Sequence, residues 1–150
     1  MKKHANAPES VQMLPWPEVK EEYINEELET KWDNFIEIRS EITKVLELAR
    51  RNKQIGHSLD AKVELHAEGE ALDILKSVEK DLATLLIVSQ AVIVEGAAEG
   101  AEATGREDLK VTVAAAEGHK CERCWIYSDE VGQDAEHPTL CKRCAEAVKD

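Results

Sequence analysis

The spacing of apolar residues predicts a long helix in the first third of the chain. From about residue 29 to residue 55, apolar residues recur mostly at steps of three and four, which is typical of one face of a helix. We expect Gly56 to end this helix, after a cationic last turn. The apolar face comprises Trp32, Phe35, Ile36, Ile42, Val45, Leu46 and Ala49.

Alternation of apolar and polar residues replaces the helical spacing directly after residue 57. Residues 58–67 (SLDAKVELHA) therefore predict a half-buried strand, with His66 on its polar, exposed side. Helical spacing returns over residues 68–86, and residues 86–96 (LIVSQAVIVEG) are rich in strand-forming residues. Residues 109–118 alternate again and predict a strand that could complete the preceding sheet.

These patterns divide the chain into four parts. Residues 1–28 form an extended N-terminal segment, because Pro15 and Pro17 disfavour helix. Residues 29–95 form an α/β unit, and residues 96–108 form an acidic, glycine-rich linker. Residues 109–150 form a last unit that contains every cysteine of the chain. The fold class is α+β.

The charge of the chain is strongly negative but unevenly distributed. A net charge of −12 argues against a general nucleic-acid binder. Residues 39–63, however, carry 6 bases against 3 acids, and residues 109–150 are nearly balanced. Without a secretory signal or an apolar run near the length of a membrane span, we expect a soluble cytoplasmic protein whose thiols stay reduced.

The four cysteines form two Cys-x-x-Cys pairs separated by sixteen residues. Two pairs at this spacing can surround one tetrahedral ion, and four soft thiolates favour one Zn²⁺ per chain. Two redox-active pairs or an iron centre are the alternatives, but nothing around the cysteines resembles a thioredoxin-like βαβ unit. The predicted ligands are Cys121, Cys124, Cys141 and Cys144. A closed four-thiolate shell stabilises a fold and leaves no position for a substrate.

Cations lie inside both cysteine pairs: Arg123 in the first, and Lys142 and Arg143 in the second. They could contact phosphates beside Trp125, or they could only offset the negative charge of a zinc ion held by four thiolates. Trp125 could instead pack in the small core. Because the cysteines complete a tetrahedron, we expect His119 and His137 to lie outside the metal shell.

Two stretches resemble bacterial isoleucyl-tRNA synthetase in the same order along the chain. Residues 32–65 (WDNFIEIRSEITKVLELARRNKQIGHSLDAKVEL) resemble the region that follows its anticodon-binding bundle. Residues 116–132 and 140–148 (AEGHKCERCWIYSDEVG and LCKRCAEAV) resemble its zinc-binding C-terminal end, and residues 9–18 resemble the segment before the long helix. A related zinc finger occurs in formamidopyrimidine-type DNA glycosylases.

The resemblance implies a tRNA-binding C-terminal fragment of a ligase that joins isoleucine to its tRNA with ATP. The HIGH-type and KMSKS-type motifs of the catalytic core are absent from this sequence, so we expect no catalytic residues and no activity from the chain alone. The expected partners of this monomer are isoleucine-specific tRNA and the remainder of the synthetase, with no membrane. The expected RNA-binding residues are Arg50, Arg51, Lys53, Arg123, Trp125, Lys142 and Arg143. A DNA-binding zinc finger of glycosylase type and a protein-interaction module are the alternatives.

Overall fold

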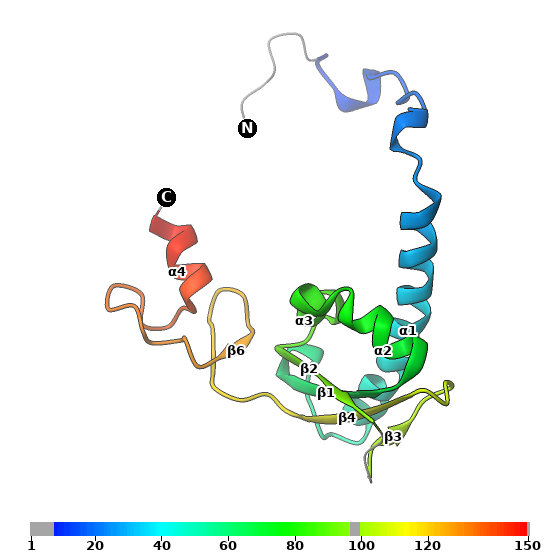
Figure 1. Ribbon diagram of the computed structural model, residues 1–150. Coiled ribbons are helices and arrows are strands. Elements are labelled where there is room, and N and C mark those ends of the chain that lie inside the picture. The colour runs from blue at the N-terminus through cyan, green and yellow to red at the C-terminus, as the bar shows by residue number, and fades with distance from the viewer. Residues whose placement is uncertain (1–7, 97–99, 150) are drawn as a thin grey trace.

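A four-stranded sheet with helices packed against one face forms the body of the molecule. This computed structural model describes residues 8–96 and 100–149. The strands β1 (Ala61–Ala67), β2 (Gln90–Glu95), β3 (Glu102–Ala103) and β4 (Leu109–Ala115) follow the order β2-β1-β4-β3. β1 is parallel to β2 and antiparallel to β4, and β3 is antiparallel to β4 (Figure 1).

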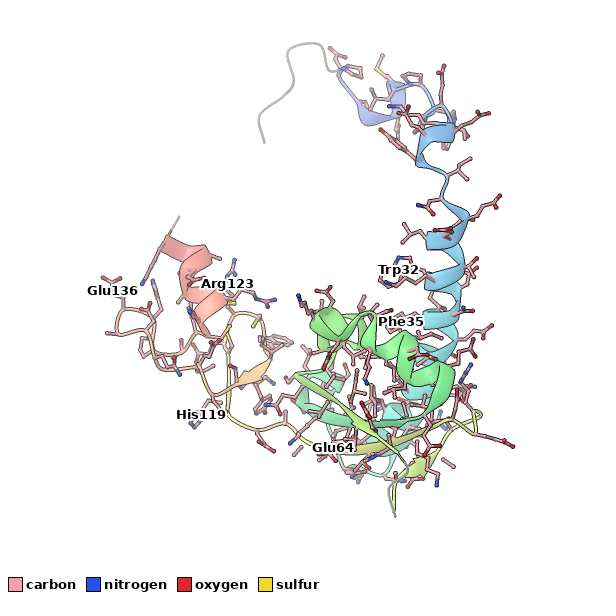
Figure 2. The ribbon with its side chains drawn as sticks, in the orientation of Figure 1. Trp32, Phe35, Glu64, His119, Arg123 and Glu136 are labelled. Carbon is pink, nitrogen blue, oxygen red and sulfur yellow. The ribbon has the colours of Figure 1, made fainter. Side chains whose placement is uncertain are left out.

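The long helix α1 (Glu26–Arg51) supplies most of the helical side of the core. The side chain of Asn25 caps its first turn by accepting a hydrogen bond from the Leu28 amide at 3.0 Å. Figure 2 shows Trp32 and Phe35 on the side of α1 that faces the other helices, and their rings meet edge to face at 5.7 Å. The buried residues of α1 are Phe35, Ile38, Ile42, Val45, Leu46 and Ala49.

The apolar face of α1 differs from the predicted one at two positions. Ile36 is 58% exposed, whereas Ile38, which the prediction omitted, is fully buried. Successive buried residues at 35, 38, 42 and 45 keep the three-and-four spacing, and Ile36 lies on the opposite side of the helix. The prediction that Trp32 packs with the core is confirmed, because it lies partly buried against that cluster.

The C-terminus of α1 corrects the prediction that Gly56 ends the helix. The backbone instead turns at Lys53, which has a left-handed φ of 60°. Its amide donates to the Arg50 carbonyl at 3.0 Å, and the Gln54 amide donates to the Ala49 carbonyl at 2.9 Å. This pair of hydrogen bonds is a Schellman motif, so the turn depends on backbone geometry and not on a glycine.

The segment between β1 and β2 contains two short helices where the apolar spacing predicted one. Helix α2 (Gly69–Lys76) and helix α3 (Leu82–Leu86) are separated by a 3₁₀ turn at Glu79–Asp81, and another 3₁₀ turn, Ser58–Asp60, precedes β1. Both helices contribute to the same core as α1 and the sheet, through Leu75 and Leu82. They form the crossover that two parallel strands require.

The acidic segment before β4 is tied into the sheet unit. It contains β3, and the Gly105 amide donates to the Glu41 carboxylate at 2.7 Å. Asp108 accepts a hydrogen bond from the Ala71 amide at 3.1 Å, and its own carbonyl accepts from the Glu68 amide at 3.0 Å. Asp108 thus caps the N-terminus of α2, where Glu68 provides no side-chain cap.

The cysteine unit follows β4 and contains β5 (His119–Lys120), β6 (Tyr127–Ser128) and helix α4 (Lys142–Lys149). Its hairpin is attached to the body by the Tyr127 amide, which donates to the Ser89 hydroxyl at 2.7 Å. Ser89 also donates to the Leu59 carbonyl, and Lys120 lies 3.6 Å from the Asp60 carboxylate. These bonds give the unit a defined position beside β1 and β2 (Figure 1).

The segment before α1 extends from the end of that helix that lies farther from the sheet (Figure 1). It contains two single 3₁₀ turns, Val11–Met13 and Glu21–Tyr23, and is otherwise without regular structure over residues 8–25. Among the helices of the described ranges, none is long and apolar enough to cross a membrane.

Candidate metal centre and nucleic-acid interface

The fold brings the four cysteines together at one point. Their sulfur atoms all lie within 4.8 Å of one another, and three of the four residues are buried. The sulfurs of Cys124 and Cys141, from different pairs, are 3.8 Å apart. A tetrahedron with metal–sulfur bonds of about 2.3 Å has edges of about 3.8 Å, so this donor set fits one zinc ion.

Each pair is shaped by local backbone hydrogen bonds. In the first pair, the Trp125 amide donates to the Cys121 carbonyl at 2.8 Å, closing a tight turn. In the second, the Cys144 and Ala145 amides both donate to the Cys141 carbonyl at 2.9 Å as α4 begins. The N-terminus of α4 therefore lies at the metal site, where its dipole favours thiolate charge.

The environment moves the acidities of the thiols in opposite directions. Burial raises the pKa of Cys121, but amides that include that of Cys141, 3.4 Å from the sulfur, outweigh it and lower the pKa to about 6. Burial raises the pKa of Cys141 to about 12 and also raises the pKa of Cys124. Such buried thiols need a cation to become thiolates together, and one Zn²⁺ supplies that charge.

Two of the predicted RNA-binding arginines face the sulfur cluster. A guanidinium nitrogen of Arg123 lies 3.7 Å from the Cys144 sulfur, and Figure 2 shows Arg123 beside α4. The neighbouring Cys124 sulfur raises the pKa of the Arg143 guanidinium. Both arginines are thus placed to offset the negative charge of four thiolates around a divalent ion, which was the alternative to phosphate contact.

Lys142 and Trp125 are both exposed to solvent. Lys142 has no ion-pair partner among the described residues, and Trp125 is 58% exposed with a left-handed φ of 67°. The alternative that Trp125 packs in the small core is therefore wrong. The Lys120 ammonium lies 5.7 Å from the Trp125 ring centre and 5.8 Å from the Tyr127 ring centre. Sequence reasoning missed Lys120, although it directly precedes the first cysteine.

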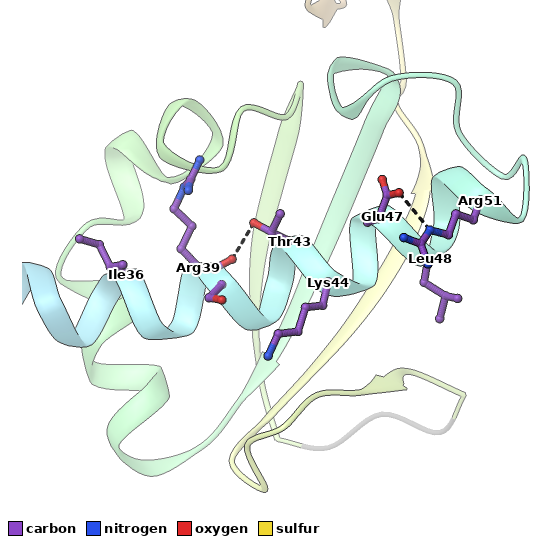
Figure 3. A pocket seen from close by; sticks show the side chains of 8 residues that line it. Ile36, Arg39, Thr43, Lys44, Glu47, Leu48 and Arg51 are labelled. Carbon is purple, nitrogen blue, oxygen red and sulfur yellow. Dashed lines mark hydrogen bonds and ion pairs between the residues drawn. The ribbon is translucent and has the colours of Figure 1, made fainter.

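Among the cations at the end of α1, two form ion pairs within the protein and one does not. The Glu47 carboxylate binds both Arg50, at 2.7 and 2.8 Å, and Arg51, at 3.0 Å. Hydrogen bonds from these two arginines lower the pKa of Glu47 to about 2. Figure 3 shows Glu47 and Arg51 on the exposed side of α1, along a shallow groove of about 800 Å³. Lys53 is exposed on the turn that follows and forms no ion pair with another described residue.

His119 and His137 lie outside the cysteine cluster, as expected. The prediction that His66 is exposed is wrong: it is 8% exposed, and its ring nitrogen Nε2 lies 3.2 Å from the Thr112 hydroxyl. His66 does lie on the polar face of β1, but β1 is a central strand, so neighbouring strands cover its side chain on both sides.

Residues 118–147 match the family described as the zinc finger found in FPG and IleRS. The matched range contains all four cysteines, both hairpin strands and most of α4. The C-terminal unit is therefore a zinc finger of this family, and its cofactor is one zinc ion.

Nearly the whole chain is similar to the C-terminal region of bacterial isoleucine–tRNA ligases. It is 53% identical over 143 residues to the ligase of Desulforamulus reducens, a match that covers 94% of this chain. It is 48% identical to the ligase of Caldanaerobacter subterraneus subsp. tengcongensis over 95% of the chain, and 46% identical to that of Syntrophomonas wolfei over 99%. The chain spans only 15–16% of the length of these relatives.

Proposed function

We propose that this chain is the tRNA-contacting C-terminal region of an isoleucine–tRNA ligase, with the zinc finger as a rigid support for the contact. The observation that carries the proposal is the similarity of 46–53% over nearly the whole chain to ligases, combined with the matched zinc finger. The whole ligase would attach isoleucine to its tRNA with ATP in the cytoplasm, where zinc-bound thiols stay reduced.

The exposed cations suggest where the RNA contact lies. In a chain of net charge −12, a phosphate backbone can approach only where a cation stands clear of carboxylates. Lys142 and Lys53 meet this condition, and Trp125 offers an exposed ring on which a base could stack. Arg50, Arg51, Arg123 and Arg143 would contribute less, since each already has a partner within the protein.

The second candidate is a DNA-binding zinc finger, because the matched family also occurs in FPG proteins. The near-neutral charge of residues 109–150, with 6 bases and 8 acids, does not favour duplex DNA. Competition between tRNA and duplex DNA for the zinc-loaded chain, at one fixed salt concentration, separates the two candidates. Preference for tRNA supports the ligase region, preference for the duplex supports the DNA finger, and binding of neither leaves a protein-interaction module.

A further inference from the structure

Exposed apolar side chains are concentrated in the segment that precedes and begins α1. Residues 8–28, here called the N-terminal strap, hold seven of the thirteen large apolar side chains that are exposed in the described part of the chain. Trp16 is 93% exposed and Val19 is 85% exposed. The seven are Met13, Leu14, Trp16, Val19, Tyr23, Ile24 and Leu28. Apolar surface gathered in this way marks an interaction site.

The strap does not fold back on the body of the molecule. Its hydrogen bonds within the described ranges are all local, such as those from the Met13 amide to the Ser10 carbonyl and from the Leu28 amide to Asn25. Its apolar residues take no part in the core formed by α1, α2, α3 and the sheet. The strap therefore presents an uncovered tryptophan to whatever lies beside it.

The charge of the strap limits what can cover it. Residues 18–29 carry six glutamates and one lysine, Lys20, whose ammonium lies 5.1 Å from the Tyr23 ring centre. No ion pair found among the described residues involves any of these glutamates. Phosphates of RNA and anionic lipids would be repelled, and a two-fold contact with a second copy would bring the same carboxylates together. The glutamates instead fit a surface with basic residues at its edge.

We propose that the N-terminal strap binds an apolar groove, edged by lysine and arginine, on the part of an isoleucine–tRNA ligase that lies outside this region. This inference rests on the proposed function, since it takes the chain to be part of such a ligase. The relatives are about six times longer than the matched region, so most of the ligase surface lies outside it. Trp16 is the anchor of the contact, and the glutamates of residues 18–29 form its polar rim.

Hydroxyl-radical footprinting of the two exposed tryptophans tests this proposal. The chain is compared by itself and joined to the rest of the Desulforamulus reducens ligase in place of the region that it matches, after aminoacylation activity shows that the joined protein is folded. Without tRNA, oxidation of Trp16 should fall about tenfold in the ligase, because its exposed surface becomes covered. Trp125 should stay as reactive as in the chain alone, and added tRNA should protect it if the proposed function is correct.

Three results would contradict the strap proposal, and a fourth would contradict only the proposed function. Equal oxidation of Trp16 in the chain and in the ligase shows that nothing covers it. Protection that depends on the concentration of the chain alone identifies a second copy, and protection only after tRNA is added identifies RNA. Loss of tRNA protection at Trp125, with Trp16 still protected, overturns the proposed function but leaves strap docking intact.

A charge reversal supplies a matched control. Glu21→Lys with Glu22→Lys should restore at least half of the oxidation of Trp16 in the ligase, because the new ammonium groups would face a basic edge. Glu37→Lys with Glu79→Lys changes the same charge at exposed positions outside the strap and should leave protection unchanged. If both pairs restore oxidation equally, net charge and not the strap determines the contact, and the proposal is wrong.

Discussion

Lys53 holds the backbone in a conformation that a lysine adopts only at a cost. The left-handed turn after α1 suits glycine, which has no Cβ to clash with the carbonyl group. Lys53→Gly should therefore raise the free energy of unfolding by about 0.5–1 kcal/mol, measured by urea denaturation. The same change should weaken tRNA binding if the ammonium touches phosphate. A stability that stays equal or falls would show that the turn is not strained.

Asp108 couples stability to pH through the cap that it gives α2. Hydrogen bonding from Arg106 lowers the pKa of Asp108, and the amide of Ala71 adds to this effect. Because its folded pKa lies below the unfolded value, its contribution is present above about pH 4 and is lost as pH falls further. Asp108→Ala should cost about 1 kcal/mol at pH 7.

The pH dependence separates this capping role from simple loss of packing. The difference in unfolding free energy between wild type and Asp108→Ala should shrink as pH falls below 4, since the protonated carboxyl group then binds Arg106 less well. Glu107→Ala, next to it in the chain, is the control. A difference that stays constant from pH 7 to pH 3 would contradict the account.

At the scale of elements, the sequence predicted local structure well and its connections poorly. The three-and-four spacing predicted α1, and alternation predicted β1 and β4, because a single buried face dictates each pattern. The hydrogen bond from the Gly105 amide to the Glu41 carboxylate, by contrast, joins residues that are far apart in the chain. Periodicity depends on neighbouring residues only, so it cannot predict such contacts.

The metal site shows the same division between local and distant information. The spacing of the cysteines predicted their meeting, because two short turns with shared chemistry need only one hairpin to join them. Whether Arg123 and Arg143 face the metal or the solvent could not be deduced from the sequence. An arginine between two cysteines is the same in sequence whichever way its side chain points.

Zinc should determine the folding of the finger but not that of the sheet unit. The buried cluster of the finger consists of cysteines, with only Ile126, Val131 and Leu140 packed partly against it as apolar support. Zinc binding, worth about 10–16 kcal/mol in finger peptides, is expected to provide its stability. Chelation should move the NMR signals of residues of about 117–148 to random-coil chemical shifts. The signals of residues 29–95 should keep their folded chemical shifts. Collapse of every signal would contradict this independence.

Ser89 should fix the orientation of the finger on the sheet. Its hydroxyl accepts from the Tyr127 amide and donates to the Leu59 carbonyl, so Ser89→Ala leaves both groups without that partner. We expect the free energy of unfolding to fall by about 1–2 kcal/mol, with zinc content unchanged. The residual dipolar couplings of the finger and of the sheet should no longer fit one common alignment. Ser77→Ala removes a hydroxyl that bonds only within its own turn and should leave the couplings unchanged.

At the scale of the whole molecule, the chain is acidic, with a net charge of −12. No candidate catalytic residue emerges from the described ranges, and the sequence carries no motif for ATP or amino-acid binding. We therefore predict that the purified chain catalyses no isoleucine-dependent pyrophosphate exchange above a blank. Exchange above the blank, retained after repeated purification, would contradict the proposal that this region only supports the reaction.

The salt dependence of tRNA binding tests the central claim most directly. In a ligase that carries this region, Lys53→Ala with Lys142→Ala should weaken binding and reduce the slope of log K against log salt by about 1.4–1.8, if each lysine contacts one phosphate. Zinc content should not change, since neither residue is a ligand. Lys31→Ala with Lys80→Ala removes equal charge from exposed positions elsewhere and should leave the slope unchanged. Equal losses in both double variants, or no loss in either, would contradict the claim that these two cations carry the contact with RNA.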